Sequence, residues 1–187
     1  MTPRRSSSGG IWLVAAVALL LAPHLAPASS TRPPAHARRH ATAAPAPSGR
    51  ALAANPRITT TRVHGCDPAA DLRSPRLDAR VRELLAGAAR RFLIRVSCVH
   101  TGHSKYVKGT ARVSNHYVWR AVDLDRVDGR PVGPGNARAR ALARWIGNLR
   151  GELRPSEVGS PWLFGPGPWF SDAGHQGHVH VGYGRRR

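Results

Sequence analysis

Histidine and aspartate residues gather in two short stretches of this 187-residue chain, and together these residue types can bind a metal ion. The stretch SNHYVWRAVDL at 114–124 holds His116 and Asp123, and the stretch GHQGHVHVGY at 174–183 holds His180. Zinc is bound by neutral imidazole and carboxylate groups, and a catalytic zinc site uses three protein ligands and leaves the fourth position to water. A lone histidine would more often be a surface or capping residue, but the grouping makes these three residues candidate ligands.

An α+β arrangement of elements is predicted to position these residues. Apolar residues at helical spacing predict helices, and alternating or β-branched runs predict strands. The expected elements are a helix over 74–91, strands over 92–99 and 119–127, a helix over 136–153, a loop over 155–174 and a strand over 178–183. In the last strand, His178 and His180 share one face. This order predicts an α+β fold with a small, mostly antiparallel sheet and helices packed on one side.

The N-terminal part of the chain has the pattern of an export signal followed by a linker. A basic head, an apolar run over 11–22 and small residues before a cleavage site at Ala28 predict a signal peptide over 1–28. The apolar run is shorter than the ~18 to 20 residues that cross a bilayer, which disfavours a membrane anchor. Residues 29–57 are rich in Pro, Ala and Arg and predict a disordered linker, so the folded domain is expected over 58–187.

The charge of the chain limits its partners. The formal charge is +19, and because Lys105 and Lys108 are the only lysines, arginine supplies the other 27 of the 29 basic residues. Such a surplus attracts nucleic acid, anionic lipid or acidic cell-wall polymers. With an export signal and no recognisable nucleic-acid-reading motif, the predicted partner is peptidoglycan or another anionic wall polymer, and nucleic acid is not expected. The predicted protein is a secreted or wall-associated monomer without a membrane anchor after signal cleavage.

The two cysteines, Cys66 and Cys98, both fall in the part of the chain expected outside the cytoplasm. In an oxidising compartment such a pair is expected to form a disulfide. Neither cysteine has the CxxC spacing of a metal or redox site. The predicted bridge would join the entry segment of the domain to its sheet.

Two ordered motifs resemble those of a known family. The motifs are Ser114-x-His116, Ala121-x-Asp123-Leu124 and, farther along, His178-x-His180-x-Gly182-Tyr183. They are similar to the SxHxxGxAxDL and HxH motifs of the D-alanyl-D-alanine carboxypeptidase family of zinc metallopeptidases. The resemblance implies the small α+β fold shared with the N-terminal domain of hedgehog proteins, a Zn²⁺ cofactor and cleavage of peptidoglycan peptides. It also implies that His116, Asp123 and His180 hold the zinc and that Ser114 helps to bind the substrate peptide.

Two positions depart from the family pattern. The family has Glu or Asp as general base three residues before the last zinc histidine, where this chain has Gly177. The first motif usually has Gly where this chain has Trp119, whose indole could narrow the cleft or pack on its far side. A general base typically contributes ~10²- to 10⁴-fold, so a chain without one could bind zinc and peptide yet turn over poorly. The alternative function is a non-catalytic, zinc-containing wall-binding module, which a fourth protein ligand such as His178 would favour.

Other residues are candidates for supporting roles in catalysis. His178, with Asp172 and His175 nearby, could replace the missing base or could only orient a ligand or water. Arg112 and Arg95 could supply a cation for a substrate carboxylate, although a solvated surface is the simpler interpretation of any one arginine in this chain. The remaining candidates are Trp162 and Trp169, which could line a substrate groove or fill the core.

Overall fold

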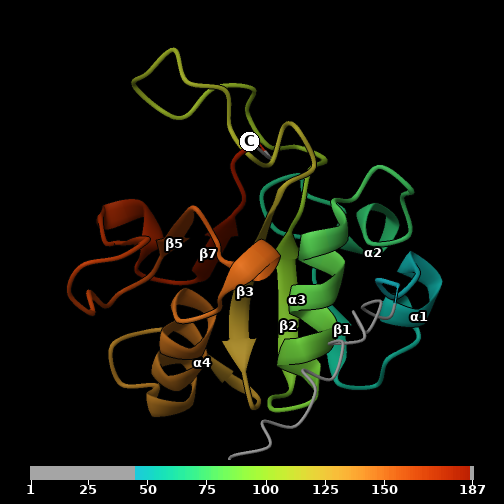
Figure 1. Ribbon diagram of the computed structural model, residues 1–187, viewed down its shortest axis with the longest axis horizontal. Coiled ribbons are helices and arrows are strands. Elements are labelled where there is room, and N and C mark those ends of the chain that lie inside the picture. Colours follow the sequence, from blue (N-terminus) through green and yellow to red (C-terminus); the bar gives the residue numbers. More distant parts are fainter. Residues whose placement is uncertain (1–44, 186–187) are drawn as a thin grey trace, which may run out of the picture. The chain divides into compact units, whose positions relative to one another are not determined.

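The computed structural model describes residues 45–185, and the predicted signal peptide lies outside the described residues. The described part forms an α+β domain with a seven-stranded mixed sheet (Figure 1). Within this part, no helix has the length and apolar character needed to cross a membrane. The predicted α+β class is confirmed.

The sheet runs in the order β1-β2-β3-β7-β5-β6, and β4 pairs with β3. The strands are β1 Ile58–Thr60, β2 Ile94–Cys98, β3 Ala121–Val127, β4 Arg130–Pro131, β5 Glu157–Gly159, β6 Trp169–Phe170 and β7 Val179–Gly182. The pairs β1/β2 and β5/β6 are parallel, and the other four pairings are antiparallel. The strands that carry the two sequence motifs, β3 and β7, are therefore direct neighbours.

Two longer helices, α3 Ala79–Ala89 and α4 Ala137–Gly147, cover one face of this sheet (Figure 1). The shorter helical elements are α1 Gly49–Ala53, α2 Pro68–Asp71 and the 3₁₀ turns η1 Gly151–Leu153 and η2 Ala173–His175. The side chain of Asp78 caps α3, so this helix begins after the predicted start near residue 74. Asn136 caps α4 as predicted, but the helix ends at Gly147, and η1 occupies only the last three residues of the predicted range.

Alternation along the strands gives the sheet one apolar and one polar face. The apolar face is packed into the core by residues such as Val122, Leu124, Val158, Val179 and Val181. Asp123 and His180 lie between these residues in sequence and therefore point to the opposite face. In the register of β3 and β7, Asp123 is paired directly with His180, and Cys98 of β2 is paired with Asp123 on the other side. The sheet thus places polar residues of both motifs side by side.

Two segments that the sequence assigned to irregular structure belong to the fold. The predicted linker, 29–57, includes α1, whose Leu52 is 1% exposed in the core, so the packed domain begins near Ser48 rather than at residue 58. The predicted loop, 155–174, contains β5 and β6. Both corrections concern elements of two to five residues in Pro-, Ala- or Gly-rich sequence, which are too short to show a hydrophobic period.

The predicted disulfide between Cys66 and Cys98 is present in the structure. It joins the segment between β1 and α2 to the last residue of β2. The N-terminal segment of the domain is therefore attached covalently to the sheet at Cys98, next to Asp123.

Reduction of this disulfide is expected to destabilise the metal-free domain. The cysteines are 32 residues apart in sequence, and closing a loop of this size in the unfolded chain corresponds to about 3 to 4 kcal/mol in the chain-entropy description. Guanidinium unfolding with and without a phosphine reductant measures the difference in free energy of unfolding. The same reductant should leave Cys66→Ala/Cys98→Ala unchanged, and an unchanged midpoint in the native chain would contradict the expectation.

Candidate metal centre

Three side-chain atoms converge on the polar face of the sheet. His116 Nε2 lies 3.1 Å from His180 Nδ1 and 3.2 Å from Asp123 Oδ1, and Asp123 Oδ1 lies 2.9 Å from His180 Nδ1. Ligands bound at about 2.0 to 2.1 Å in a zinc tetrahedron are separated by roughly 3.3 to 3.4 Å, so a small expansion of this triangle would admit the ion. His116, Asp123 and His180, called here the motif ligands, are thus brought together as predicted, in a geometry that fits a metal ion.

The orientation of His116 is fixed by its own loop. Its Nδ1 lies 2.6 Å from the carbonyl oxygen of Val99, so Nδ1–H donates to this carbonyl and Nε2 is the ring nitrogen that faces the other motif ligands. The backbone N–H of His116 donates to Ser114 Oγ at 3.2 Å. The ring also stacks on His103, with centroids 4.1 Å apart. Ser114, predicted to contact substrate, therefore also supports the loop that presents a ligand.

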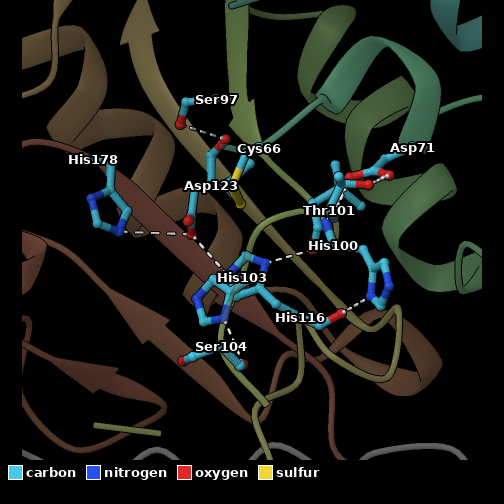
Figure 2. The surroundings of a disulfide bond; sticks show 12 residues. Cys66, Asp71, Ser97, His100, Thr101, His103, Ser104, His116, Asp123 and His178 are labelled. Atoms are coloured by element: carbon cyan, nitrogen blue, oxygen red, sulfur yellow. Dashed lines mark hydrogen bonds and ion pairs between the residues drawn. A yellow bond between two sulfur atoms is a disulfide. The ribbon is translucent and has the colours of Figure 1, made fainter. Parts of the chain in front are cut away.

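The N-terminal segment of the domain supports His116 indirectly, through His100. Asp71 in α2 accepts hydrogen bonds from the backbone N–H groups of His100 and Thr101, at 2.9 and 2.8 Å. This contact holds the start of the loop that follows β2. His100 Nδ1–H then donates to the carbonyl of His116 at 3.0 Å (Figure 2). Sequence reasoning missed Asp71, because nothing in its local sequence connects it to a residue 29 positions later.

His180 lies between two carboxylates. Its Nδ1 faces Asp123 Oδ1, and its Nε2 lies 3.2 Å from Glu157 Oε1. Burial alone would lower the pKa of His180, but the hydrogen bonds to both carboxylates outweigh it and raise the pKa to about 9. At neutral pH the metal-free imidazolium therefore donates to both acids. A metal ion held at Nδ1 would take the place of one proton, and Nε2–H would still donate to Glu157.

Both acids remain ionised at neutral pH. Burial raises the pKa of Asp123, but the opposing effect of the adjacent His116 and His180 is larger, so the pKa lies well below its usual range. Burial likewise raises the pKa of Glu157, and hydrogen bonds from His180, Arg112 and Asn115 more than reverse this. Glu157 was missed by the sequence analysis. Its one sequence signal is that it is the only acidic residue in 154–171.

Cys98 lies beside the motif ligands without being an available ligand. The Cys98 Sγ atom, a ring nitrogen of His116 and a carboxylate oxygen of Asp123 lie within 4.8 Å of one another, forming a buried group that could hold a metal ion. However, the Cys98 sulfur is bonded to Cys66 (Figure 2), and zinc binds cysteine as a thiolate. In the oxidised protein the nearest other candidate for a third ligand atom is His180 Nδ1, which lies 3.1 Å from His116 Nε2 and 2.9 Å from Asp123 Oδ1.

A cleft of about 780 Å³ opens over the motif ligands. His178 lines it, with Nε2 3.7 Å from Asp123 Oδ1 (Figure 2). Burial is the main cause of a lowered pKa for His178, and the charge of Asp123 only partly opposes it. His178 is therefore neutral at pH 7 and can accept a proton. The predicted strand included His178, but β7 begins at Val179, so His178 precedes the strand and lines the same cleft as His180.

Asp172 and His175 also lie at the cleft. His175 Nδ1–H donates to Asp172 Oδ1 at 2.7 Å, which leaves His175 Nε2 free to act as an acceptor. The His175 ring lies 5.0 Å from that of His178 and 5.5 Å from that of His180, between centroids. A Cβ on Gly159 would come within 2.5 Å of the His175 ring, so this glycine makes room for the histidine over the sheet. The structure thus brings together all the residues proposed as substitutes for the missing base.

The two candidate arginines have different surroundings. Arg112 lines the cleft and donates to Glu157 Oε2 at 2.9 Å. Arg95 donates to both carboxylate oxygens of Asp125, at 2.8 and 2.5 Å, and does not line the cleft. Only Arg112 is therefore placed to meet a bound substrate.

The three candidate tryptophans pack away from the cleft. Trp119 stacks on His100, with centroids 4.0 Å apart, and packs against the core rather than narrowing the site. Its φ of 62° lies in the left-handed region that favours glycine. Trp162 and Trp169 also pack against the core, so of the two roles considered for them, core filling is the one observed.

The affinity for Zn²⁺ is expected to rise with pH, because the ion replaces the proton on His180. With a metal-free pKa of about 9, affinity should rise about tenfold per pH unit below that value and level off above it. Competition with a chelator at pH 6 to 8 measures the slope. In Glu157→Gln, one carboxylate that raises this pKa is lost, so the slope should become shallower, and the limiting affinity above pH 9, where the proton no longer competes, should fall about 10- to 100-fold. Equal slopes in both proteins would contradict this account.

Comparisons of the chain with protein-family models, with curated proteins and with solved structures found no match. The family resemblance of the two motifs therefore stays a prediction. The functional argument that follows depends on the geometry of the site.

Proposed function

We propose that the protein is an exported zinc-dependent peptidase that acts on peptidoglycan peptides, as a D-alanyl-D-alanine carboxypeptidase or an endopeptidase. The observation that carries this proposal is the convergence of the three motif ligands at the floor of an open cleft. Two imidazoles and one carboxylate suit zinc, and three protein ligands with an open side are typical of catalytic rather than structural zinc sites. The disulfide is consistent with a non-reducing compartment.

The surroundings of the cleft support a short peptide with a free carboxylate as substrate. A volume of about 780 Å³ is within the range of small-ligand sites, about 300 to 1,000 Å³. Lys108 and Arg112 line the cleft and can attract a carboxylate. The charge of +19 would concentrate the protein on an anionic wall. These features support the peptidoglycan assignment through charge complementarity.

The chain supplies proton transfer through histidine, since Gly177 has no side chain to act as base. When bound, zinc would polarise the substrate carbonyl and lower the pKa of the attacking water. His178 Nε2, neutral and facing Asp123, is placed to accept a proton from that water and to pass it to the leaving amine. Asp172 holds His175 in the tautomer with a free Nε2, so His175 is a second proton acceptor at the same cleft.

A second function is favoured by one specific distance. His178 Nε2 is 3.7 Å from Asp123 Oδ1, close to the roughly 3.3 to 3.4 Å between neighbouring ligands of a zinc tetrahedron. If His178 bound the metal, four protein ligands would close the site and exclude water. The protein would then be a non-catalytic, zinc-containing wall-binding module.

His178→Ala separates the two functions. If His178 is the base, the variant should retain one zinc per chain with unchanged affinity and lose about 10²- to 10⁴-fold in kcat on a D-alanine-terminated peptide. If His178 is a ligand, the variant should lose zinc affinity, and the native chain should be inert on both this peptide and whole peptidoglycan. The experiment uses residues 29–187, with elemental analysis for zinc and product detection by mass spectrometry. A native chain without bound metal would refute both functions.

A further inference from the structure

The disulfide adjoins the candidate metal centre. Cys98 is paired with Asp123 across β2 and β3, and Asp123 is paired with His180 across β3 and β7, so the three residues form one row across the sheet. The Cys98 sulfur lies within 4.8 Å of the ligand atoms of both His116 and Asp123. A residue whose side chain is a strong zinc ligand therefore lies beside the three motif ligands.

The space around the sulfur would allow it to turn toward the metal. A cavity of about 230 Å³ is lined by both cysteines and also by His103, Asp123 and His178. In Figure 2 the disulfide lies next to the Asp123 carboxylate, which both His116 and His178 approach. In a zinc tetrahedron a thiolate at about 2.3 Å would be separated from the nitrogen ligands by roughly 3.5 Å. Once its bond to Cys66 is broken, the Cys98 side chain can cover the remaining distance by rotation about χ1.

We propose that Cys98 is a latent metal ligand that the disulfide withholds from the site. When the bond to Cys66 is reduced, the Cys98 sulfur completes a closed, four-ligand site with the motif ligands. When the bond is formed, the fourth position stays open to water and substrate. This inference depends on the metal centre of the proposed function.

The chemistry of the switch is a two-electron reduction. With a phosphine as reductant, the S–S bond breaks, the phosphine becomes a phosphine oxide by taking the oxygen of one water, and the two protons of that water end on the two sulfurs. The Cys98 thiol then releases its proton to solvent when its sulfur binds the metal. In the opposite direction, the disulfide of a partner accepts two electrons from the cysteine sulfurs, one proton from the Cys66 thiol and one proton from solvent; its two sulfurs become thiols, the Cys66–Cys98 bond re-forms and Cys98 leaves the metal.

Two consequences follow for function. The closed site should bind the ion at least about tenfold more tightly, because it has a fourth protein ligand that is also a thiolate. It should lose hydrolytic activity by more than about tenfold, because no position is left for water. A chain that is still reduced would therefore be inactive, and oxidation outside the reducing compartment would open the site.

Cobalt substitution tests this inference by spectroscopy rather than by activity. Co²⁺ bound by imidazole and carboxylate shows only visible d–d bands, whereas a thiolate ligand adds a charge-transfer band in the near ultraviolet. The oxidised native chain should show d–d bands alone, and adding the phosphine after cobalt loading should produce the charge-transfer band.

A pair of variants provides the matched control. Cys66→Ser and Cys98→Ser both lack the disulfide and should lose the same stability, but they keep different sulfurs. Cys66→Ser should show the charge-transfer band without reductant and bind Co²⁺ at least about tenfold more tightly than Cys98→Ser, which should show no band. Circular dichroism tests whether both variants are folded. The charge-transfer band of the reduced native chain tests the same inference without either variant.

The outcomes distinguish this inference from the proposed function. Bound cobalt with d–d bands, but no charge-transfer band in reduced native protein or in Cys66→Ser, would overturn the latent ligand and leave the metal centre intact. A charge-transfer band in Cys98→Ser would also overturn it, because the sulfur would then belong to Cys66. If the oxidised native chain binds no cobalt, the metal centre fails, and the inference fails with it.

Discussion

Replacement of His116 by alanine is expected to abolish zinc binding and hydrolysis together. His116 supplies one corner of the ligand triangle, 3.1 and 3.2 Å from the other two ligand atoms. Structural zinc sites with four ligands bind with about 10 to 16 kcal/mol, or roughly 2.5 to 4 kcal/mol per ligand, so loss of one ligand corresponds to about 10²- to 10³-fold in affinity. Chelator competition measures the affinity, and elemental analysis of the purified variant measures the zinc that remains.

The matched control for this variant is His103→Ala. His103 stacks on His116 and lines the same cleft, but it supplies no atom to the ligand triangle. This variant should therefore keep one zinc per chain. If His116→Ala is folded by circular dichroism and keeps its zinc with native affinity, the metal is bound elsewhere and the proposed centre is wrong.

Introducing an acid at position 177 is expected to produce the largest gain in activity. Gly177→Asp places a carboxylate three residues before His180, where the resembling family has its general base. A Cβ built on Gly177 meets no other described heavy atom within 4 Å, so the side chain can be accommodated. Because a positioned base typically contributes ~10²- to 10⁴-fold, Gly177→Asp in a His178→Ala background, which lacks the proposed histidine base, should raise kcat on a D-alanine-terminated peptide by up to that range while zinc content stays constant.

Gly177→Asn in the same background is the control for the gain. Its side chain has nearly the same size and polarity but cannot take a proton from water at neutral pH. An equal gain in both variants would show that the effect is not general-base catalysis. No gain from Gly177→Asp in the otherwise native chain, combined with an active native chain, would show that the histidines at the cleft already provide the base.

The sequence predicted which strand face Asp123 and His180 occupy, because that follows from local alternation. Asp123 and His180 each alternate with buried valines or leucines, which places them on one face of a strand whatever the partner strand is. The cap at Asn136 was predictable from residue type and a short local context, and the disulfide from the presence of two cysteines in a chain with an export signal. The part of the site that follows from alternation, capping and cysteine count was therefore accessible from sequence.

The supporting residues were not accessible because their contacts depend on long-range pairing. Glu157 reaches His180 only because β5 pairs with β7, and β5 is three residues long in a Pro/Gly-rich segment. Asp71 contacts the loop after β2 only because the Cys66 segment folds back on the sheet. No periodicity in the sequence encodes either encounter, so both roles could be assigned only from the structure.

The position of His180 between two acids bears on the order in which the protein matures. In the metal-free domain, the imidazolium supplies a positive charge between Asp123 and Glu157, so the two buried anions do not face each other without a counter-ion. This charge compensation needs no metal ion. If the proposed centre binds a metal, loading would be an exchange of the His180 proton for an ion, and it would not have to precede folding.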